Sequence, residues 1–214
     1  MAWVRLRYST LVNYCSHLFR ALTSVAFVVI VARKLPVAEF GLWGIILSSV
    51  ALLSQPVSLW MYWARREVAR GNGEASGSAL AMSLAYLALA LPAYVMLGVA
   101  YDAMLGWGLE YFIIAIPLLM VTVMQLWAGG VISVLRPEFY GYAQVIRELV
   151  RLAVGYALVV YLGLGLTGAI VAVIAARLSM LLAYLVGLLG ASLSVRLTPG
   201  KLSLAFTWLK RGLI

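Results

Sequence analysis

The first apolar stretch of the sequence carries a row of polar side chains. Its members are Asn13, Ser16, His17, Arg20, Thr23 and Ser24. Their spacings of one and three residues place them on one face of an α-helix, whose period is 3.6 residues. Arg20 lies near the middle of the stretch, where an arginine facing lipid costs about 2.5–3.5 kcal/mol on insertion scales. Arg20 must therefore face protein, water or an anion.

Two interpretations of Arg20 remain open at this point. It could cap backbone carbonyls inside a helix bundle, or it could line a water-filled cavity, which the length of the polar row favours. In the second interpretation His17 and Asn13 line the cavity too, together with Gln55 from a weaker polar row in the next apolar stretch. Ordinary packing through small residues explains that weaker row nearly as well. Pro56 predicts a kink at this place.

Further charges fall inside later apolar stretches. Arg147, Glu148 and Arg151 lie close together, and Arg177 lies near the centre of the last stretch. With Arg20, the apolar stretches contain four basic residues and one acidic residue, Glu148, well inside a stretch. This leaves excess positive charge in a medium of low dielectric constant. An anionic ligand would compensate this charge, and the arginine fork suits phosphate. The alternative for Glu148 and Arg151 is a common i,i+3 pair at a solvated helix end.

The composition requires a membrane around these helices. Of the 214 residues, 65% are hydrophobic and 11% are charged, and the mean hydropathy is +1.04. A water-soluble domain carries roughly 25% charged residues. A water-soluble fold of this size could not hide so much apolar surface, so lipid must cover it.

Six stretches are long enough to cross a bilayer, which requires about 20 apolar residues. They lie near residues 10–32, 40–62, 78–101, 110–133, 142–163 and 167–190. None shows the alternation of a barrel strand, so the sequence predicts an all-α membrane protein with a six-helix bundle. The connections are short, and none could form a soluble catalytic domain.

The basic residues predict the orientation, since cytoplasmic connections collect Lys and Arg. With a cytoplasmic N-terminus, ten basic residues lie inside: Arg5, Arg7, Arg65, Arg66, Arg70, Arg136, Arg196, Lys201, Lys210 and Arg211. Only Arg33 and Lys34 lie outside. We therefore expect a multi-pass protein of the cell membrane with both termini cytoplasmic. The net charge of +9 has this explanation and predicts no nucleic-acid partner.

The sequence offers no covalent chemistry. His17 is the only histidine and Cys15 the only cysteine, so no metal cluster and no intrachain disulfide are expected. No nucleophile–base pair or phosphate loop is visible. We therefore expect neither a cofactor nor enzymatic activity.

The end of the chain predicts a second segment. Residues 1–195 form the expected six-helix lobe. After Pro199 and Gly200, residues 202–214 turn apolar again, as at the start of a seventh helix too short to cross. Residues 196–214 are therefore interpreted as a cytoplasmic linker and the start of a truncated helix.

Three motifs resemble the polysaccharide flippases of the multidrug/oligosaccharidyl-lipid/polysaccharide exporter superfamily. The first runs from Val31 to Gly41 and contains Ala-Arg-Lys-Leu followed by Phe-Gly. The second is the basic segment from Arg65 to Asn72, and the third is Gly165 to Ala169 at the start of the sixth stretch. The motifs are short, but together they extend over nearly the whole chain.

The resemblance implies a fold and a function. Such proteins have 12 to 14 helices in two six-helix lobes and move polyprenyl-(pyro)phosphate-linked sugars across the membrane by alternating access. This chain then corresponds to the N-terminal lobe, with a lipid-linked anionic glycan as substrate and a second lobe as partner. Arg20 and Arg177, with Arg147 and Arg151, are the expected phosphate contacts.

Three other interpretations remain. The first is a multidrug-type exporter of the same superfamily, which usually needs a buried acid to carry the coupling cation. The second is an intramembrane enzyme acting on polyprenyl phosphates, for which Asp102 and Glu110 are a poor pair of metal ligands. The third is a membrane scaffold, which would be better served by uncharged helices.

Overall fold

The computed structural model describes residues 2–190 and residue 208, and these residues form helices joined by short turns. The helical elements are α1 (Ala2–Lys34), α2 (Val37–Ser54), α3 (Val57–Ala69), α4 (Glu74–Leu105), α5 (Leu109–Ile114), α6 (Ile116–Leu135), α7 (Pro137–Gly155), η1 (Tyr156–Tyr161) and α8 (Gly165–Leu189). The prediction of an all-α membrane protein is confirmed. The expected linker and seventh helix at residues 196–214 lie outside the described residues, apart from residue 208.

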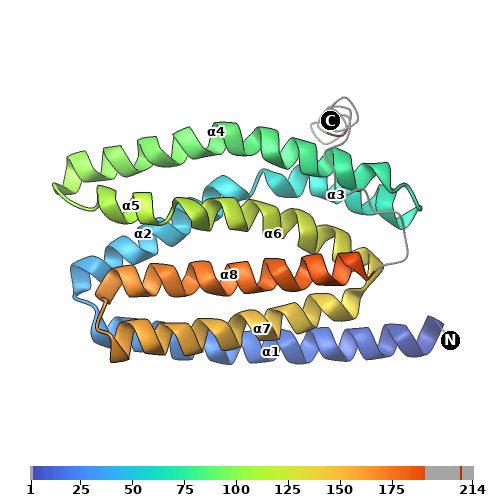
Figure 1. Ribbon diagram of the computed structural model, residues 1–214, viewed down its shortest axis with the longest axis horizontal. Coiled ribbons are helices and arrows are strands. Elements are labelled where there is room, and N and C mark those ends of the chain that lie inside the picture. The colour runs from blue at the N-terminus through green and yellow to red at the C-terminus, as the bar shows by residue number, and fades with distance from the viewer. Residues whose placement is uncertain (1, 191–207, 209–214) are drawn as a thin grey trace.

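The elements combine into six rods that follow the six predicted stretches. Figure 1 shows the rods side by side along the long axis of the molecule. One end of the bundle, here called the N end, carries the N-terminus and the α3–α4 and α6–α7 connections. The other, here called the far end, carries the α1–α2, α4–α5 and η1–α8 connections. At two of these turns, Gly71 (φ 87°) and Gly106 (φ 74°) adopt a left-handed conformation that strains other residues.

Prolines explain two breaks within the rods. The second rod is interrupted between Ser54 and Val57, which confirms the kink predicted at Pro56. The fourth rod is interrupted at Ala115, two residues before a proline in the first turn of α6. A proline lacks the N–H that would continue the helix and crowds the preceding turn. A third irregularity is the π-helix η1, which continues α7.

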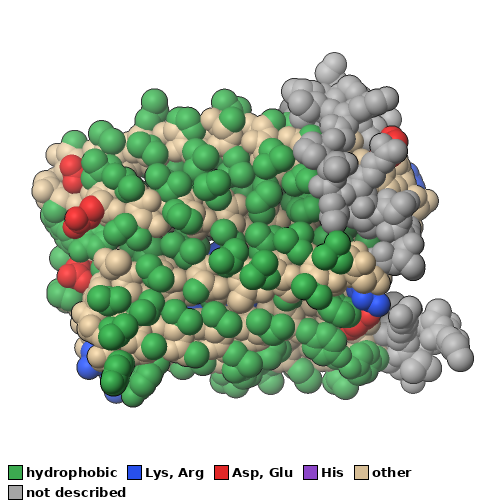
Figure 2. All heavy atoms as spheres, in the orientation of Figure 1, with side chains coloured by type: hydrophobic (Ala, Val, Ile, Leu, Met, Phe, Trp, Pro, Cys, Tyr) green, Lys and Arg blue, Asp and Glu red, His purple; other side chains and the backbone are tan. Residues whose placement is uncertain are grey.

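Five of the six rods contain a segment long and apolar enough to cross a membrane: Tyr8–Lys34, Val37–Ser54, Glu74–Leu105, Leu109–Leu135 and Gly165–Leu189. The remaining rod, α7 with η1, carries too many charges for this criterion, among them Arg147, Glu148 and Arg151. Its 25 residues would still extend about 37 Å at 1.5 Å per residue, enough to span the hydrocarbon. Figure 2 shows hydrophobic side chains over the middle of one face and charged groups mainly at the ends.

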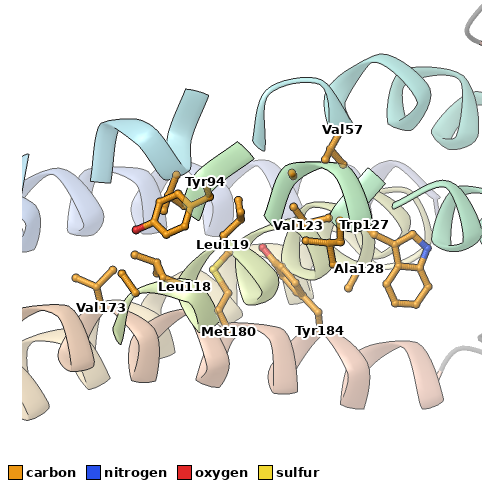
Figure 3. Close-up of a cluster of buried hydrophobic side chains, with 14 of the residues drawn as sticks. Val57, Tyr94, Leu118, Leu119, Val123, Trp127, Ala128, Val173, Met180 and Tyr184 are labelled. Atoms are coloured by element: carbon orange, nitrogen blue, oxygen red, sulfur yellow. The ribbon is translucent and has the colours of Figure 1, made fainter. Parts of the chain in front are cut away.

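Small residues let the rods approach closely in the core. On α8, Ala169, Ala172 and Ala176 are buried, and α8 packs closely against α7 and α6. Such residues are typical of helix interfaces in membranes, where packing replaces the hydrophobic drive between helices. Figure 3 shows Met180 and Tyr184 of α8 among the core residues of α6. The face of α8 that builds the core therefore also supplies side chains to the site described next.

Candidate functional site: a cationic cavity

A cavity of about 550 Å³ lies within the bundle, and five helices line it. The helices pack as a series: α1 against α7, α7 against α8, α8 against α6, and α6 against α3. All five contribute residues to the wall, so α1 and α3 form the two ends of the series around the cavity. Its lining comprises Asn13, His17, Arg20, Ser58, Met61, Arg65, Gln125, Leu126, Gly129, Gly130, Ser133, Tyr140, Gln144, Arg147, Arg177, Met180 and Tyr184.

The polar row of α1 has two parts with different surroundings. Asn13, His17 and Arg20 line the cavity, as the polar spacing led us to expect. The hydroxyl of Thr23, one turn further along, lies 2.8 Å from the Phe19 carbonyl oxygen and 2.9 Å from Glu148 Oε2, and its one proton can be donated to either acceptor. The first part of the row thus faces the cavity, and the second part joins α1 to α7.

Four arginines from four helices reach the cavity: Arg20, Arg65, Arg147 and Arg177. Arg177 donates from Nη1 to Gln125 Oε1 at 3.2 Å, a neutral acceptor. Arg65 donates from Nε to the Met61 carbonyl oxygen of its own helix at 3.2 Å. Arg20 forms no hydrogen bond or ion pair with any described residue. Three guanidinium groups therefore line the cavity without a described carboxylate partner.

Glu148 is the acidic residue that pairs with arginines next to the cavity. It is fully buried and lies outside the cavity lining. Its carboxylate accepts hydrogen bonds from the guanidinium groups of Arg147 and Arg151 and from the Thr23 hydroxyl. Arg147 binds it through Nε at 2.9 Å and also through Nη2. One carboxylate thus serves two arginines. Because Glu148 is not among the lining residues, the wall itself stays cationic.

Three uncharged polar side chains of the wall have buried atoms without a hydrogen-bond partner among the described residues. The side chain of Gln144 is buried, and neither its nitrogen nor its oxygen has a hydrogen bond among the described residues. The same holds for Asn13 Oδ1 and the Tyr184 hydroxyl. The Tyr184 ring stacks on that of Tyr140, with centroids 5.8 Å apart and planes 12° apart. A buried polar group without a partner is costly, so these atoms are suited to water or a polar ligand.

Two of the expected site residues lie outside the cavity. Arg151 donates to Glu148 and to Ser24 Oγ at 2.9 Å, and its guanidinium lies over the Phe27 ring at 5.1 Å. Gln55 is exposed at the break between α2 and α3. The expectation that they join the cavity is therefore corrected. Hydrogen bonds to Glu148 and Ser24 hold Arg151 between α1 and α7, and Gln55 lies at the exposed break between α2 and α3.

Other lining residues were not selected from the sequence. Gln125 lies on a mainly apolar helix whose few polar residues, such as Thr122 and Ser133, form no long polar row. Arg65 was assigned to a cytoplasmic connection, although α3 continues to Ala69 and carries this side chain along the wall. Gln144 lies on the charged face of α7, and the charged residues near it in the sequence are the feature that could have identified it as a lining residue. Among the described residues, no group of three His, Cys, Asp or Glu side chains could hold a metal ion.

The rods and the cavity together define a helical membrane protein whose polar site lies inside the bundle. No protein-family model and no curated protein sequence matches the chain. Solved structures do match it, and all three described here are transporters. An outward-facing multidrug resistance MATE family transporter of the MOP superfamily shares the fold with a TM-score of 0.69 and 20% identity.

Two further structures give the same result. A MOP superfamily transporter from Pyrococcus furiosus Vc1 (DSM3638) matches with a TM-score of 0.66 and 20% identity. A MATE P26A mutant matches with a TM-score of 0.66 and 22% identity. The matches cover 98% of this chain but only 49–51% of the transporters. The chain therefore has the fold of about half of a MOP superfamily transporter.

Proposed function

We propose that this chain is one lobe of an exporter that moves a polyprenyl-(pyro)phosphate-linked oligosaccharide across the cell membrane by alternating access. The observation that carries the proposal is the group of cavity arginines without described carboxylate partners: Arg20, Arg65 and Arg177. A phosphate or pyrophosphate would supply the missing negative charge. It would also accept paired hydrogen bonds from the planar guanidinium forks.

The proposed transporter is completed by a second lobe. The chain spans about half the length of the transporters that share its fold. Polar residues of α1, at one end of the helix series around the cavity, are exposed, including His17 and Arg20. A polar surface of this kind cannot remain against lipid without large cost. A second six-helix lobe, either another chain or a second copy, would cover it. We place both termini of this lobe in the cytoplasm.

A multidrug-type exporter is the second candidate, because one structure with this fold is described as a multidrug resistance transporter. The charge of the cavity argues against a cationic drug. The described wall contains four arginines and no Asp or Glu. The Pyrococcus furiosus transporter is described as having a reversed polarity of the binding pocket that suggests a different function. Pocket polarity is thus a reasonable criterion among proteins of this fold.

The test is complementation of glycan export in cells that depend on this transporter. Arg20→Lys keeps the charge but loses the bidentate fork, so it should reduce export, and Arg20→Ala should reduce it further. Arg66→Ala is the matched control, because Arg66 is exposed, lies outside the cavity lining and stacks over Tyr62 and Trp63. It should leave export unchanged. Membrane levels of each variant are measured in parallel.

The outcome decides between the candidates. Full export by the Arg20→Ala/Arg177→Ala double variant would remove the anion-binding role. Resistance to cationic drugs that is conferred by the chain and lost in the same variant would favour the multidrug candidate.

A further inference from the structure

On three of the five helices that line the cavity, an arginine and an uncharged polar group lie at different depths. On α1, Asn13 precedes Arg20 by seven residues, and on α8 Tyr184 follows Arg177 by seven. On α7, Gln144 precedes Arg147 by three residues. α1 and α7 begin at the N end of the bundle and α8 ends there (Figure 1). On all three helices the uncharged group is therefore nearer the N end.

The helical rise converts these intervals into distances. At 1.5 Å per residue, the offset along the axis is about 10 Å on α1 and α8 and about 4.5 Å on α7. Arg20, Arg147 and Arg177 thus form a deep layer, and Asn13, Gln144 and Tyr184 form an outer layer closer to the N end. We call these the arginine layer and the amide–phenol layer. Arg65 of α3 reaches the wall beside this outer layer, since Gly130 faces Arg65 and the adjacent Gly129 faces Tyr184.

The amide–phenol layer is built to hold a ligand. Gln144 and Tyr184 are each 1% exposed, and each lines the cavity with polar atoms that have no partner in the described part of the chain. Gln144 offers both a donor and an acceptor, and the phenol of Tyr184 can act as either. Space beside them depends on small residues. A side chain at Gly129 would meet Tyr184 Cε2 at 2.8 Å, and one at Gly141 would meet Asn13 Oδ1 at 2.8 Å.

We propose that the amide–phenol layer is a subsite for the uncharged, hydroxyl-bearing sugar next to the phosphate that the arginine layer binds. This inference rests on the proposed function and assigns the substrate an orientation in the cavity. The phosphate lies at the depth of Arg20 and Arg177, and the first sugar extends toward the N end. Sugar hydroxyls both donate and accept, which matches groups that can do the same.

Binding to the purified full chain in detergent, measured by isothermal titration calorimetry, tests the subsite. The probes are inorganic phosphate and glucose 1-phosphate. In the wild type, glucose 1-phosphate should bind more tightly than phosphate. Tyr184→Phe and Gln144→Leu should each weaken glucose 1-phosphate about threefold to tenfold, the equivalent of one neutral hydrogen bond. Both variants should leave phosphate binding unchanged.

Two matched controls are available. Tyr94→Phe also removes a buried phenol hydroxyl without a described partner, but Tyr94 lies outside the cavity lining. Gln55→Leu makes the same change as Gln144→Leu at an exposed position. Neither control should change the affinity of either probe. Because the Gln144 side chain bonds to no described residue, Gln144→Leu should also keep the thermal stability of the unliganded protein.

The results separate the two levels of the argument. If Tyr184→Phe and Gln144→Leu bind glucose 1-phosphate as the wild type does, the amide–phenol layer holds only water and the subsite is refuted. The proposed function survives in that case if Arg20→Ala still weakens both probes. If neither probe binds the wild type, or Arg20→Ala changes nothing, the proposed function fails and the subsite fails with it.

Discussion

Replacing Glu148 should destabilise the bundle more than replacing any exposed acid. Its carboxylate is fully buried and is shared by two guanidinium groups and the Thr23 hydroxyl. Glu148→Leu leaves Arg147 and Arg151 without this countercharge. Removing one partner of a buried ion pair costs about 3–5 kcal/mol, because the remaining charge stays desolvated. We expect a loss of this size in the free energy of unfolding.

Arg151 should account for most of that loss. Arg147 lines the cavity and can be hydrated there, whereas Arg151 is outside the lining and packed over the Phe27 ring. Removing Arg151 together with Glu148 takes away both members of a buried pair, which is often nearly neutral. The Glu148→Leu/Arg151→Leu double variant should therefore be more stable than Glu148→Leu alone.

The assay is reversible unfolding in mixed detergent micelles, followed by the fluorescence of the seven tryptophans. The control is Glu67→Leu, which breaks the ion pair with Arg70, whose side chain is 68% exposed. An exposed pair contributes about 0–1 kcal/mol. If Glu148→Leu costs no more than Glu67→Leu, or the double variant is the least stable, the buried ion pair of Glu148 and Arg151 within α7 does not stabilise the bundle as described.

Three further predictions concern packing, topology and assembly. Gly155→Ala should destabilise the bundle by about 1–3 kcal/mol, because the new Cβ would lie 2.4 Å from the Phe27 ring. The control Gly44→Ala meets no atom within 4 Å and should be neutral or stabilising. Equal free energies of unfolding for the two variants would contradict the described packing. Cysteines placed in residues 71–73 should be labelled from the cytoplasm and those in residues 102–106 from outside, and the reverse pattern would overturn the orientation. The chain purified alone should self-associate in detergent, measured by light scattering, and a stable monomer with a closed, dry bundle would argue against a missing lobe.

The sequence predicted the rods well because membrane helices are encoded by long apolar stretches and short polar connections. Prolines mark the kinks locally, as Pro56 shows. Pro117 marks the break at Ala115 in a similar way. The π-helix at Tyr156–Tyr161 had none, since its residues are as apolar as those of an ordinary helix.

The cavity could be predicted only where polar residues repeat at the helical period. Asn13, His17 and Arg20 mark a face of α1 together, so their position followed from spacing. Gln125 has only Thr122 close to it at helical spacing, which is too short a row to mark a face, and its direction depends on how α6 packs against α8. Arg151 shows the opposite case. The sequence predicts that this charge lies within a helix of the bundle, but it does not show that hydrogen bonds to Glu148 and Ser24 hold the side chain away from the cavity.

The central claim is that the cavity arginines bind a phosphorylated polyprenyl group. It is tested most directly by titrating the purified chain with farnesyl diphosphate, with farnesol as the uncharged control. Arg20→Ala/Arg177→Ala removes two charged donors, each contributing about 1.5–3 kcal/mol, so farnesyl diphosphate should bind about 100-fold more weakly or worse. Farnesol should bind both proteins alike. Equal affinity of wild type and double variant for farnesyl diphosphate would contradict the claim.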